Sequence, residues 1–389
     1  MKLQFKAAAC AFFLSIVFAA CQKEKNQLPE EVNSPLKSIS EESENGDEFA
    51  RSGSKRVYAL TNATDGNAVI IYDRSSNGML THSGTCASGG NGSGGGLGNQ
   101  DGLILSNEGE ILLAINAGSN SISSFNVNSN GIALRSTVSS GGTLPVSITQ
   151  HDDMVFVLNG GGTNNISGFK LKENGRLQPI PNSTRPLSAA STGPAQISFI
   201  KAGKVLVITE KGTNKIISYT VNEYGIPGVM HTITSSSTTP FGFDKKNGNI
   251  FVSEAVGGAP GASVLSSYNV NMNGEISLIT GSVGAGQSAA CWVVITNNGK
   301  YAYTTNTASA NISSFELNNS GGIIVSQAIA TFTLAGPVDA SLSNNSKYLY
   351  VRNGSSNSLQ AFSISNNGSL SLIQTINGLP MGANGLAAN

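Results

Sequence analysis

Between residues 55 and 389, short runs of alternating apolar and polar residues follow one another, and Gly, Asn or Ser bounds each run. Alternation with a period of two places the apolar side chains on one face of a β-strand. No apolar pattern with a period of 3.6 residues lasts long enough to predict a helix. We therefore predict an all-β fold for this part of the chain.

Three features recur together seven times in this region. In each copy a β-rich run ends in Asn or Glu, an aromatic residue follows, and a glycine stands six residues after the aromatic. The run ends are Asn62, Asn116, Asn159, Glu210, Glu254, Asn306 and Asn353; the aromatic residues are Tyr72, Phe125, Phe169, Tyr219, Tyr268, Phe315 and Phe362; the glycines are Gly78, Gly131, Gly175, Gly225, Gly274, Gly321 and Gly368. Successive copies lie about 48 residues apart, a period typical of repeat architectures.

Each copy predicts four strands. An inner strand begins at stretches such as 194–199 and 337–342, the second strand ends at the Asn or Glu, the third carries the aromatic residue, and the fourth follows the glycine. Four-stranded units repeated around an axis form a β-propeller. We expect the aromatic residues to pack between neighbouring blades and the glycines to form the hairpin turns.

The two ends of the repeat region complement each other. The first copy starts at its second strand, 56–62, and lacks an inner strand, whereas residues 380–389 resemble an inner strand with no blade after it. Pairing these two segments would cover strand edges that otherwise invite aggregation. The prediction is a seven-bladed β-propeller of four-stranded blades, with the ring closed by the C-terminal strand.

The N-terminal segment has the features of an export signal. Residues 1–20 carry two lysines and then an apolar run that is too short for a membrane span. The sequence FAAC at 18–21 predicts cleavage before Cys21 and attachment of lipid to its thiol, with a plain secretory signal as the alternative. Residues 21–54 are polar and include an acidic run, which predicts a disordered tether. We expect a lipid-anchored protein of a bacterial cell envelope, on its periplasmic or outer surface.

Composition and charge narrow the function classes. The chain has 46 glycines and only 12 % charged residues, which indicates many tight turns. Lys and Arg number 23, as do Asp and Glu, so no charge excess favours a nucleic-acid partner. No cluster of His, Cys and acidic residues has the spacing of metal ligands, so we expect no metal. We also expect a monomer without a cofactor. Cys86 and Cys291 can form one disulfide in an exported protein.

Stretches such as GGGLGNQDGLILSNEG (94–109) and AACWVVITNNGKYAYTTN (289–306) resemble the bacterial lactonase-like propellers. That family includes 6-phosphogluconolactonases and carboxymuconate-cyclising enzymes. The resemblance covers residues 55–389 and implies the propeller fold.

The resemblance does not extend to catalytic residues. Enzymes of this family carry His-x-His or Pro-His at the start of some inner strands, with arginines nearby, whereas Gly193 and Ala195 occupy the expected histidine places here. The three histidines of the chain, His82, His151 and His231, are predicted on outer strands or in the turn after an inner strand. None of them is a candidate general base at the channel mouth.

A candidate site follows from the topology of a blade. Second strands end on the face where inner strands begin, so the seven run ends gather at one channel mouth. Glu210 and Glu254 lie on adjacent blades there and can share acid and base roles, or they can cap strand ends. The ligand contacts that we expect at the same mouth are Gln100, Arg185, Gln196, Lys211, Trp292 and Asp339.

Two features leave alternatives open at this mouth. Trp292 can stack on a flat ligand or plug the channel. The glycine-rich loop 88–100 contains a formal GxGxxG, but no helix follows it, so a phosphate-binding loop is not predicted. We expect it to lie over the mouth, either as a lid or as filler.

The sequence supports two function hypotheses. The first is a non-catalytic envelope propeller that binds a small polar ligand or a partner at the channel mouth. The second is a lactonase-type hydrolase or cyclase that acts on a sugar lactone or a related small acid through Glu210 and Glu254. The hypotheses differ in whether the two carboxylates open onto a pocket or are consumed in hydrogen bonds.

Overall fold

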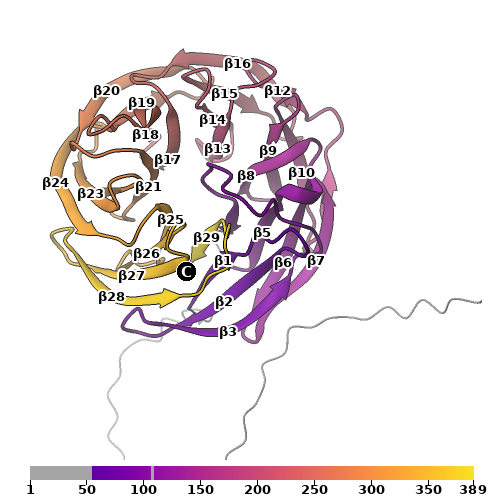
Figure 1. The fold of residues 1–389 in the computed structure, drawn as a ribbon. Helices are drawn as coiled ribbons and strands as arrows, with labels where there is room; N and C mark the ends of the chain where they lie inside the picture. Colours follow the sequence, from indigo (N-terminus) through magenta and orange to yellow (C-terminus); the bar gives the residue numbers. More distant parts are fainter. Residues whose placement is uncertain (1–54, 107–108) are drawn as a thin grey trace, which may run out of the picture.

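Seven antiparallel sheets surround a central axis in the computed structural model, which describes residues 55–106 and 109–389 (Figure 1). In each sheet the strands lie in sequence order from the axis outward, except that blade one takes its inner strand from the C-terminus. The predicted seven-bladed β-propeller is therefore confirmed. The predicted signal (1–20), the lipidated Cys21 and the tether (21–54) lie outside the described residues.

The first four blades contain sixteen of the strands in these sheets, together with one added edge strand, β12. Blade one contains β29 (Leu386–Ala388), β1 (Arg56–Leu60), β2 (Ala68–Arg74) and β3 (Leu80–Ala87). Blade two contains β4 (Leu103–Leu105), β5 (Ile111–Asn116), β6 (Ser121–Asn128) and β7 (Gly131–Ser139). Blade three contains β8 (Thr143–His151), β9 (Met154–Gly161), β10 (Asn165–Leu171) and β11 (Leu177–Pro179), with β12 (Arg185–Pro186) on β10. Blade four contains β13 (Pro194–Ile200), β14 (Val205–Glu210), β15 (Lys215–Val221) and β16 (Pro227–Thr234).

The last three blades complete the ring. Blade five contains β17 (Pro240–Lys246), β18 (Asn249–Glu254), β19 (Val264–Val270) and β20 (Ile276–Gly284). Blade six contains β21 (Ala290–Ile295), β22 (Tyr301–Asn306), β23 (Asn311–Leu317) and β24 (Ile323–Phe332). Blade seven contains β25 (Pro337–Leu342), β26 (Tyr348–Asn353), β27 (Ser358–Ile364) and β28 (Leu370–Asn377). Two short 3₁₀ turns, η1 (Ala117–Ser119) and η2 (Val256–Gly258), lie in loops.

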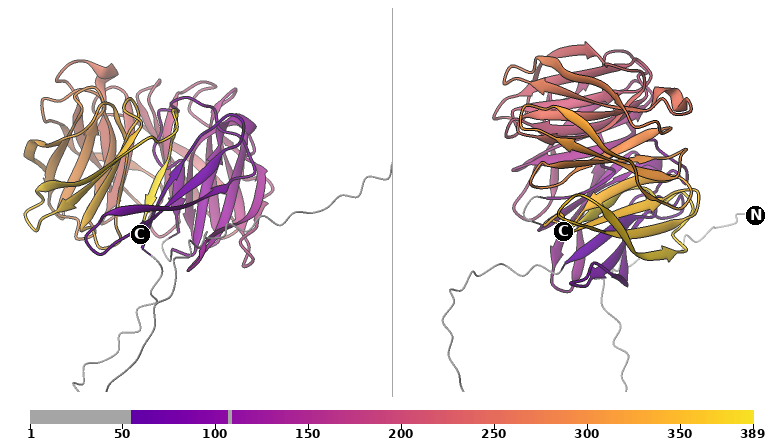
Figure 2. Two further views of the ribbon diagram at one scale, coloured as in Figure 1. Left: turned by 60° about the horizontal axis from the view of Figure 1, so that its bottom comes forward. Right: turned by 90° about the vertical axis from the view of Figure 1, so that its left-hand side faces the viewer.

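The ring closes where the sequence predicts it. Strand β29 pairs antiparallel with β1, and Figures 1 and 2 show its yellow arrow beside the indigo strand. The paired segment is shorter than the predicted 380–389, because residues 380–385 form a loop that the Asn384 amide ties to the Leu60 carbonyl at 2.8 Å. Closure therefore joins the two ends of the chain into one blade, and β29 covers the inner edge of β1.

The repeated aromatic residues and glycines have the predicted roles. Tyr268 is fully buried in a cluster that also contains Val205 and Val207 of the neighbouring blade, so it packs between blades. Burial of a large ring in such a cluster stabilises the blade interface by about 2 to 3 kcal/mol. Gly78 has φ +86°, a left-handed conformation that permits the tight turn before the outermost strand.

The channel has two mouths, which are named here by the inner strands. Mouth A is where inner strands begin and second strands end, and mouth B is where inner strands turn into second strands. No helix of the described residues is long and apolar enough to cross a membrane.

Candidate functional site

The run-end residues connect the second and third strands of their own blades. The Nδ2 of Asn306 donates to Ser313 Oγ at 2.8 Å, and the Nδ2 of Asn116 donates to Ser123 Oγ at the same distance. Each side chain is almost fully buried. Because buried polar groups need partners, this repeated contact explains why Asn or Glu recurs at the strand end.

The two glutamates of this set are also saturated with donors. Glu210 accepts the Ser188 amide at 2.9 Å and two hydroxyl donors, Ser188 and Thr213. Its side chain is fully buried and is not among the residues that line either channel pocket described below. These three hydrogen bonds hold the carboxylate in place and occupy its acceptor sites.

Glu254 has the same character in blade five. It accepts hydrogen bonds from Ser235 Oγ, from Ser266 Oγ at 2.6 Å and from Tyr268 Oη at 2.8 Å. Burial and this carboxylate raise the pKa of Tyr268, which keeps the phenol protonated as a donor. The contacts of both glutamates match the capping alternative, and catalysis by this pair stays a prediction.

The loop 88–100 does not lie loosely over mouth A but crosses the channel. The side chain of Gln100, just before blade two, exchanges two hydrogen bonds with the backbone of Val293 in blade six, at 2.9 and 3.1 Å. Trp292 Nε1 donates to the carbonyl of Asn99 at 2.8 Å. At Gly242 in blade five, a Cβ atom would collide with the Gln100 side chain, so a glycine is needed there. Residues 97–100 therefore form a plug that connects blades on opposite sides of the ring.

On the mouth A side of the plug lies pocket A, with a volume of about 460 Å³. One wall is aromatic, with the ring centroids of Phe241 and Trp292 5.1 Å apart. Lys211 Nζ lies 4.5 Å from the Phe241 ring centroid and donates to the carbonyl of Gly98. The other lining residues are Gly94–Leu97, Cys291, Thr307, Val338, Arg352, Gly354, Ser355 and Met381–Asn384. Pocket A is thus an apolar hollow with cations at its edge.

Arg352 is the charged residue that lines pocket A. Its side chain comes from β26 and is only 5 % exposed, yet its Nε has no hydrogen-bond partner. Burial lowers the pKa of Arg352 to about 10, so it remains charged near neutral pH. Asp339 is its cross-strand neighbour on β25, and burial raises the pKa of Asp339 to about 7 despite the guanidinium.

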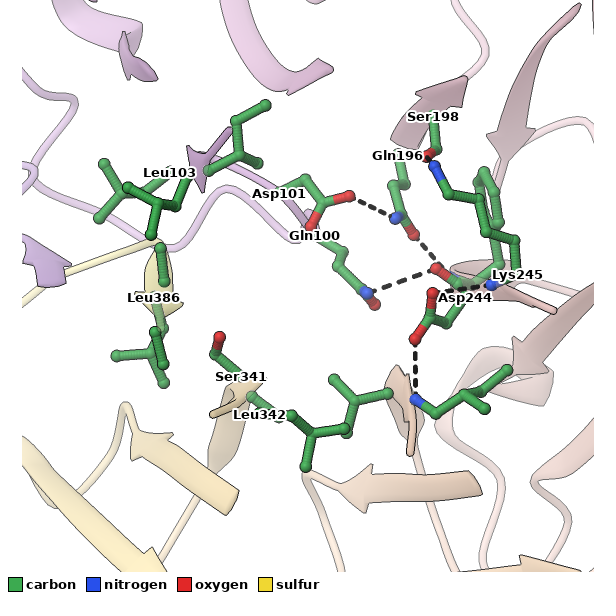
Figure 3. A pocket seen from close by; sticks show the side chains of 18 of the residues that line it. Gln100, Asp101, Leu103, Gln196, Ser198, Asp244, Lys245, Ser341, Leu342 and Leu386 are labelled. Carbon is green, nitrogen blue, oxygen red and sulfur yellow. Dashed lines mark hydrogen bonds between the residues drawn. The ribbon is translucent and has the colours of Figure 1, made fainter. Parts of the chain in front are cut away.

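On the other side of the plug, pocket B occupies about 340 Å³ of the channel (Figure 3). Polar side chains from blades four and five and from the segment before blade two line one side of this pocket, and leucines line the other. The labelled polar residues on the first side are Gln100, Asp101, Gln196, Ser198, Asp244 and Lys245. Ser341 of blade seven lies on the other side with Leu103, Leu342 and Leu386.

The polar groups of pocket B bind one another and the backbone. Gln196 donates to Asp101 Oδ2 at 2.6 Å, and Asp244 Oδ2 accepts the Ile295 amide at 2.7 Å. Lys245 Nζ donates to Ser198 Oγ at 2.8 Å. Burial raises the pKa of Asp101 to about 7. Within 55–106 and 109–389, no three His, Cys, Asp or Glu side chains are grouped to hold a metal ion.

The structure distributes the predicted ligand contacts over several places. Trp292 lines pocket A, Lys211 lies at its edge, and Asp339 lies behind Arg352. Gln100 and Gln196 line pocket B instead. Arg185 lies on β12 at the outer part of blade three, where its Nη2 donates to the Pro227 carbonyl at 2.6 Å. The expectation that Arg185 faces the mouth is wrong, because this contact directs it to the outermost strand of blade four.

The predicted disulfide is also wrong. Cys86 lies on β3 and packs in the core of blades one and two, whereas Cys291 belongs to a small cluster with Phe241 and Trp292, and they are not joined. Burial raises the pKa of Cys291 to about 11, so the thiol stays protonated. The blades that carry the two cysteines are not neighbours, and the plug crosses the channel without bringing them together.

Arg352 was not singled out by the sequence analysis, although the repeats contain a signal for it. The residue before the run end is apolar or hydroxylic in six copies, namely Thr61, Ile115, Leu158, Thr209, Ser253 and Thr305. The seventh copy has an arginine at this buried position. Comparing the copies position by position would have identified it, because burying a charge is costly and needs a reason.

Solved structures with the same fold include lactonases. The chain is similar to a periplasmic gluconolactonase from Pseudomonas aeruginosa, with 14% identity and a TM-score of 0.66 over 85% of this chain and 98% of that one. It is similar to a protein from Bacteroides uniformis proposed to be a 6-phosphogluconolactonase, with 16% identity and a TM-score of 0.65 over 85% and 99%. A protein from Lactobacillus plantarum has 15% identity and a TM-score of 0.70 over 87% and 99%.

The sequence itself gives no further match. No family model matches the chain, and no curated protein matches it. At these identities the structural likeness concerns the fold, so the chain has the fold of the lactonase-like seven-bladed propellers.

Proposed function

We propose that this protein binds a small polar ligand in pocket A. The observation that carries the proposal is the pocket itself: about 460 Å³ of space between the plug and the loops of mouth A, with Phe241 and Trp292 as one wall. A concave, mostly apolar site with a few polar groups is the usual form of a small-molecule site. The plug supplies a rigid floor, because its residues are hydrogen-bonded to several blades.

The second candidate function is hydrolysis or cyclisation of a sugar lactone or related acid. It is supported by the names of the gluconolactonase and the proposed 6-phosphogluconolactonase that share the fold. The contacts of Glu210 and Glu254 favour binding without turnover, since each carboxylate already accepts three hydrogen bonds. The residues that line pocket A include no histidine to replace them as a general base.

A titration of the purified full chain against sugar lactones and their acids tests both functions. Calorimetry should detect saturable binding that weakens at least about tenfold in Trp292→Ala, because the stacking wall is lost. Lactone hydrolysis followed with a pH indicator should not exceed the spontaneous rate. Turnover that falls in Glu210→Gln and Glu254→Gln would instead establish the enzyme. Binding that is unchanged in Trp292→Ala would place the site elsewhere.

The membrane anchor is a separate part of the proposal. The FAAC sequence that ends at Cys21 supports export and lipidation, with residues 21–54 as a tether to the envelope. Metabolic labelling with palmitate should modify the protein and should be abolished in Cys21→Ser. Labelling that persists in this variant would contradict the assignment.

A further inference from the structure

The guanidinium of Arg352 has an environment that the fold alone does not explain. Arg352 is only 5 % exposed, and its buried Nε has no hydrogen-bond partner. No hydrogen bond joins its Nη atoms to another described residue. An arginine presents five N–H donors, and buried donors are nearly always satisfied. A buried, charged and unpaired group that lines a pocket indicates a partner outside the protein.

The neighbouring carboxylate does not fill this role. Asp339 lies across the β25–β26 ladder from Arg352, but its Oδ1 accepts the backbone amide of Ala340 at 2.9 Å, and no salt bridge joins the two side chains. With its pKa near 7, Asp339 is also only partly ionised at neutral pH. The positive charge of Arg352 is therefore not neutralised by a direct contact.

The glycine-rich loop adds a second and independent set of donors. Gly95, Gly96, Leu97 and Gly98 line the same pocket, and none of their backbone amides donates to another described residue. Consecutive free amides in a loop with left-handed residues form an anion-binding concavity. The left-handed glycines Gly94 and Gly98, with φ of +73° and +58°, bound this run of amides and turn the chain at its two ends.

The charges around pocket A point the same way. The lining residues include the Arg352 cation and no carboxylate, and Lys211 lies at the edge with its Nζ on the Gly98 carbonyl. Burial lowers the pKa of Lys211 to about 8, so this ammonium is mostly charged at pH 7. A guanidinium matches the fork of a carboxylate or phosphate, and the potential of the pocket favours an anion.

We propose that pocket A binds the oxyanion group of a small organic acid. Arg352 and the free amides of the 95–98 loop hold the carboxylate or phosphate, and the body of the ligand lies against Phe241 and Trp292. This inference rests on the proposed function of pocket A and names its ligand class.

Matched probes test the ligand class without any variant. Glucose, glucuronate and glucose 6-phosphate share the same pyranose ring and differ at C6, which carries a hydroxyl, a carboxylate or a phosphate. Calorimetry on the full chain should give at least about tenfold tighter binding for one of the two acids than for glucose, with weaker binding at high salt. The better of the two acids distinguishes a carboxylate site from a phosphate site.

Variants then assign the preference to Arg352. Arg352→Gln should lose the tenfold preference while glucose affinity stays the same, and Arg352→Lys should keep part of it because charge remains without the fork. The exposed Arg176→Gln is the matched control and should bind like the natural chain. Thermal melting of each variant checks its fold. If Arg352→Gln does not fold, the preference of Arg352→Lys for an acid over glucose shows whether Arg352 contributes to acid binding.

The outcomes separate this inference from the proposed function. Equal affinity for glucose and both acids would overturn the oxyanion site and leave pocket A as a binding site. A preference for an acid that survives in Arg352→Gln would overturn the role of Arg352. Failure of all three probes to bind, together with an unsuccessful lactone and acid panel, would overturn the proposed function as well.

Discussion

Pocket A and pocket B lie on opposite sides of one plug, and charged side chains line both, but the charges have different surroundings. In pocket B, Asp101, Asp244 and Lys245 bind neighbouring side chains or backbone groups. In pocket A, Arg352 has no such partner. A charge with internal partners supports the fold, whereas a buried charge without them is a sign of a ligand. The same difference separates Arg352 from Glu254, the last residue of β18, which accepts three hydroxyl donors.

Removing the C-terminal segment should have the largest effect, because it contributes to both pockets. Residues 381–384 line pocket A, and 386–388 line pocket B as the inner strand of blade one. We expect the chain without 380–389 to melt far below the full chain or to aggregate, since the edge of β1 is exposed. An unchanged melting curve would show that ring closure does not depend on β29.

Glu254→Ala should have the next largest effect. It leaves three buried hydroxyl groups without their acceptor, so we expect the free energy of unfolding in urea to fall by about 2 to 4 kcal/mol. Ligand affinity in pocket A should stay the same. Glu254→Gln, which keeps the shape, is the control with a smaller loss. Normal stability together with lost turnover of a lactone would identify a catalytic residue instead.

The contrast between the pockets predicts opposite effects of removing a charge. Asp244→Ala should lower the free energy of unfolding by about 1 to 2 kcal/mol, because the Ile295 amide loses its acceptor. Arg352→Met should leave it unchanged or raise it by about 1 kcal/mol, because the desolvation cost of an unpaired cation disappears. Urea denaturation of both variants measures the difference. A loss in Arg352→Met as large as in Asp244→Ala would mean that Arg352 is structural.

The pH dependence should be the smallest effect and arises from Asp339. Folding raises its pKa from 3.8 to about 7. Stability from this group is therefore fully present below pH 3.8 and is lost as the pH rises through about 7. Ionised Asp339 also offsets the charge of Arg352, so an organic acid should bind more tightly at pH 6 than at pH 8. Calorimetry at both values checks this. Asp339→Asn should reduce the difference to the part that Lys211 causes, because burial lowers the pKa of Lys211 to about 8 and its ammonium is partly deprotonated at pH 8. An undiminished difference in Asp339→Asn would contradict the role of Asp339.

Much of the fold could be predicted from local sequence. Seven copies of the run end, aromatic residue and glycine predicted the blades, because each feature acts within one blade or between adjacent ones. Gly78 must adopt a left-handed turn and Tyr268 must fill a blade interface wherever the remaining blades lie. Ring closure was also readable, since an incomplete first blade and a spare C-terminal strand need each other.

The candidate site depended on contacts between distant blades, which local patterns do not specify. The sequence placed Glu210, Glu254 and Trp292 near one mouth, but only the structure shows that the glutamates are saturated while Trp292 lines a pocket. An arginine that stands where the other repeats have apolar or hydroxylic residues is visible in the sequence at position 352. Its lack of a partner is decided by the tertiary structure. The fold brings the loop before blade two and Arg352 of blade seven, which are far apart in the chain, to the same pocket.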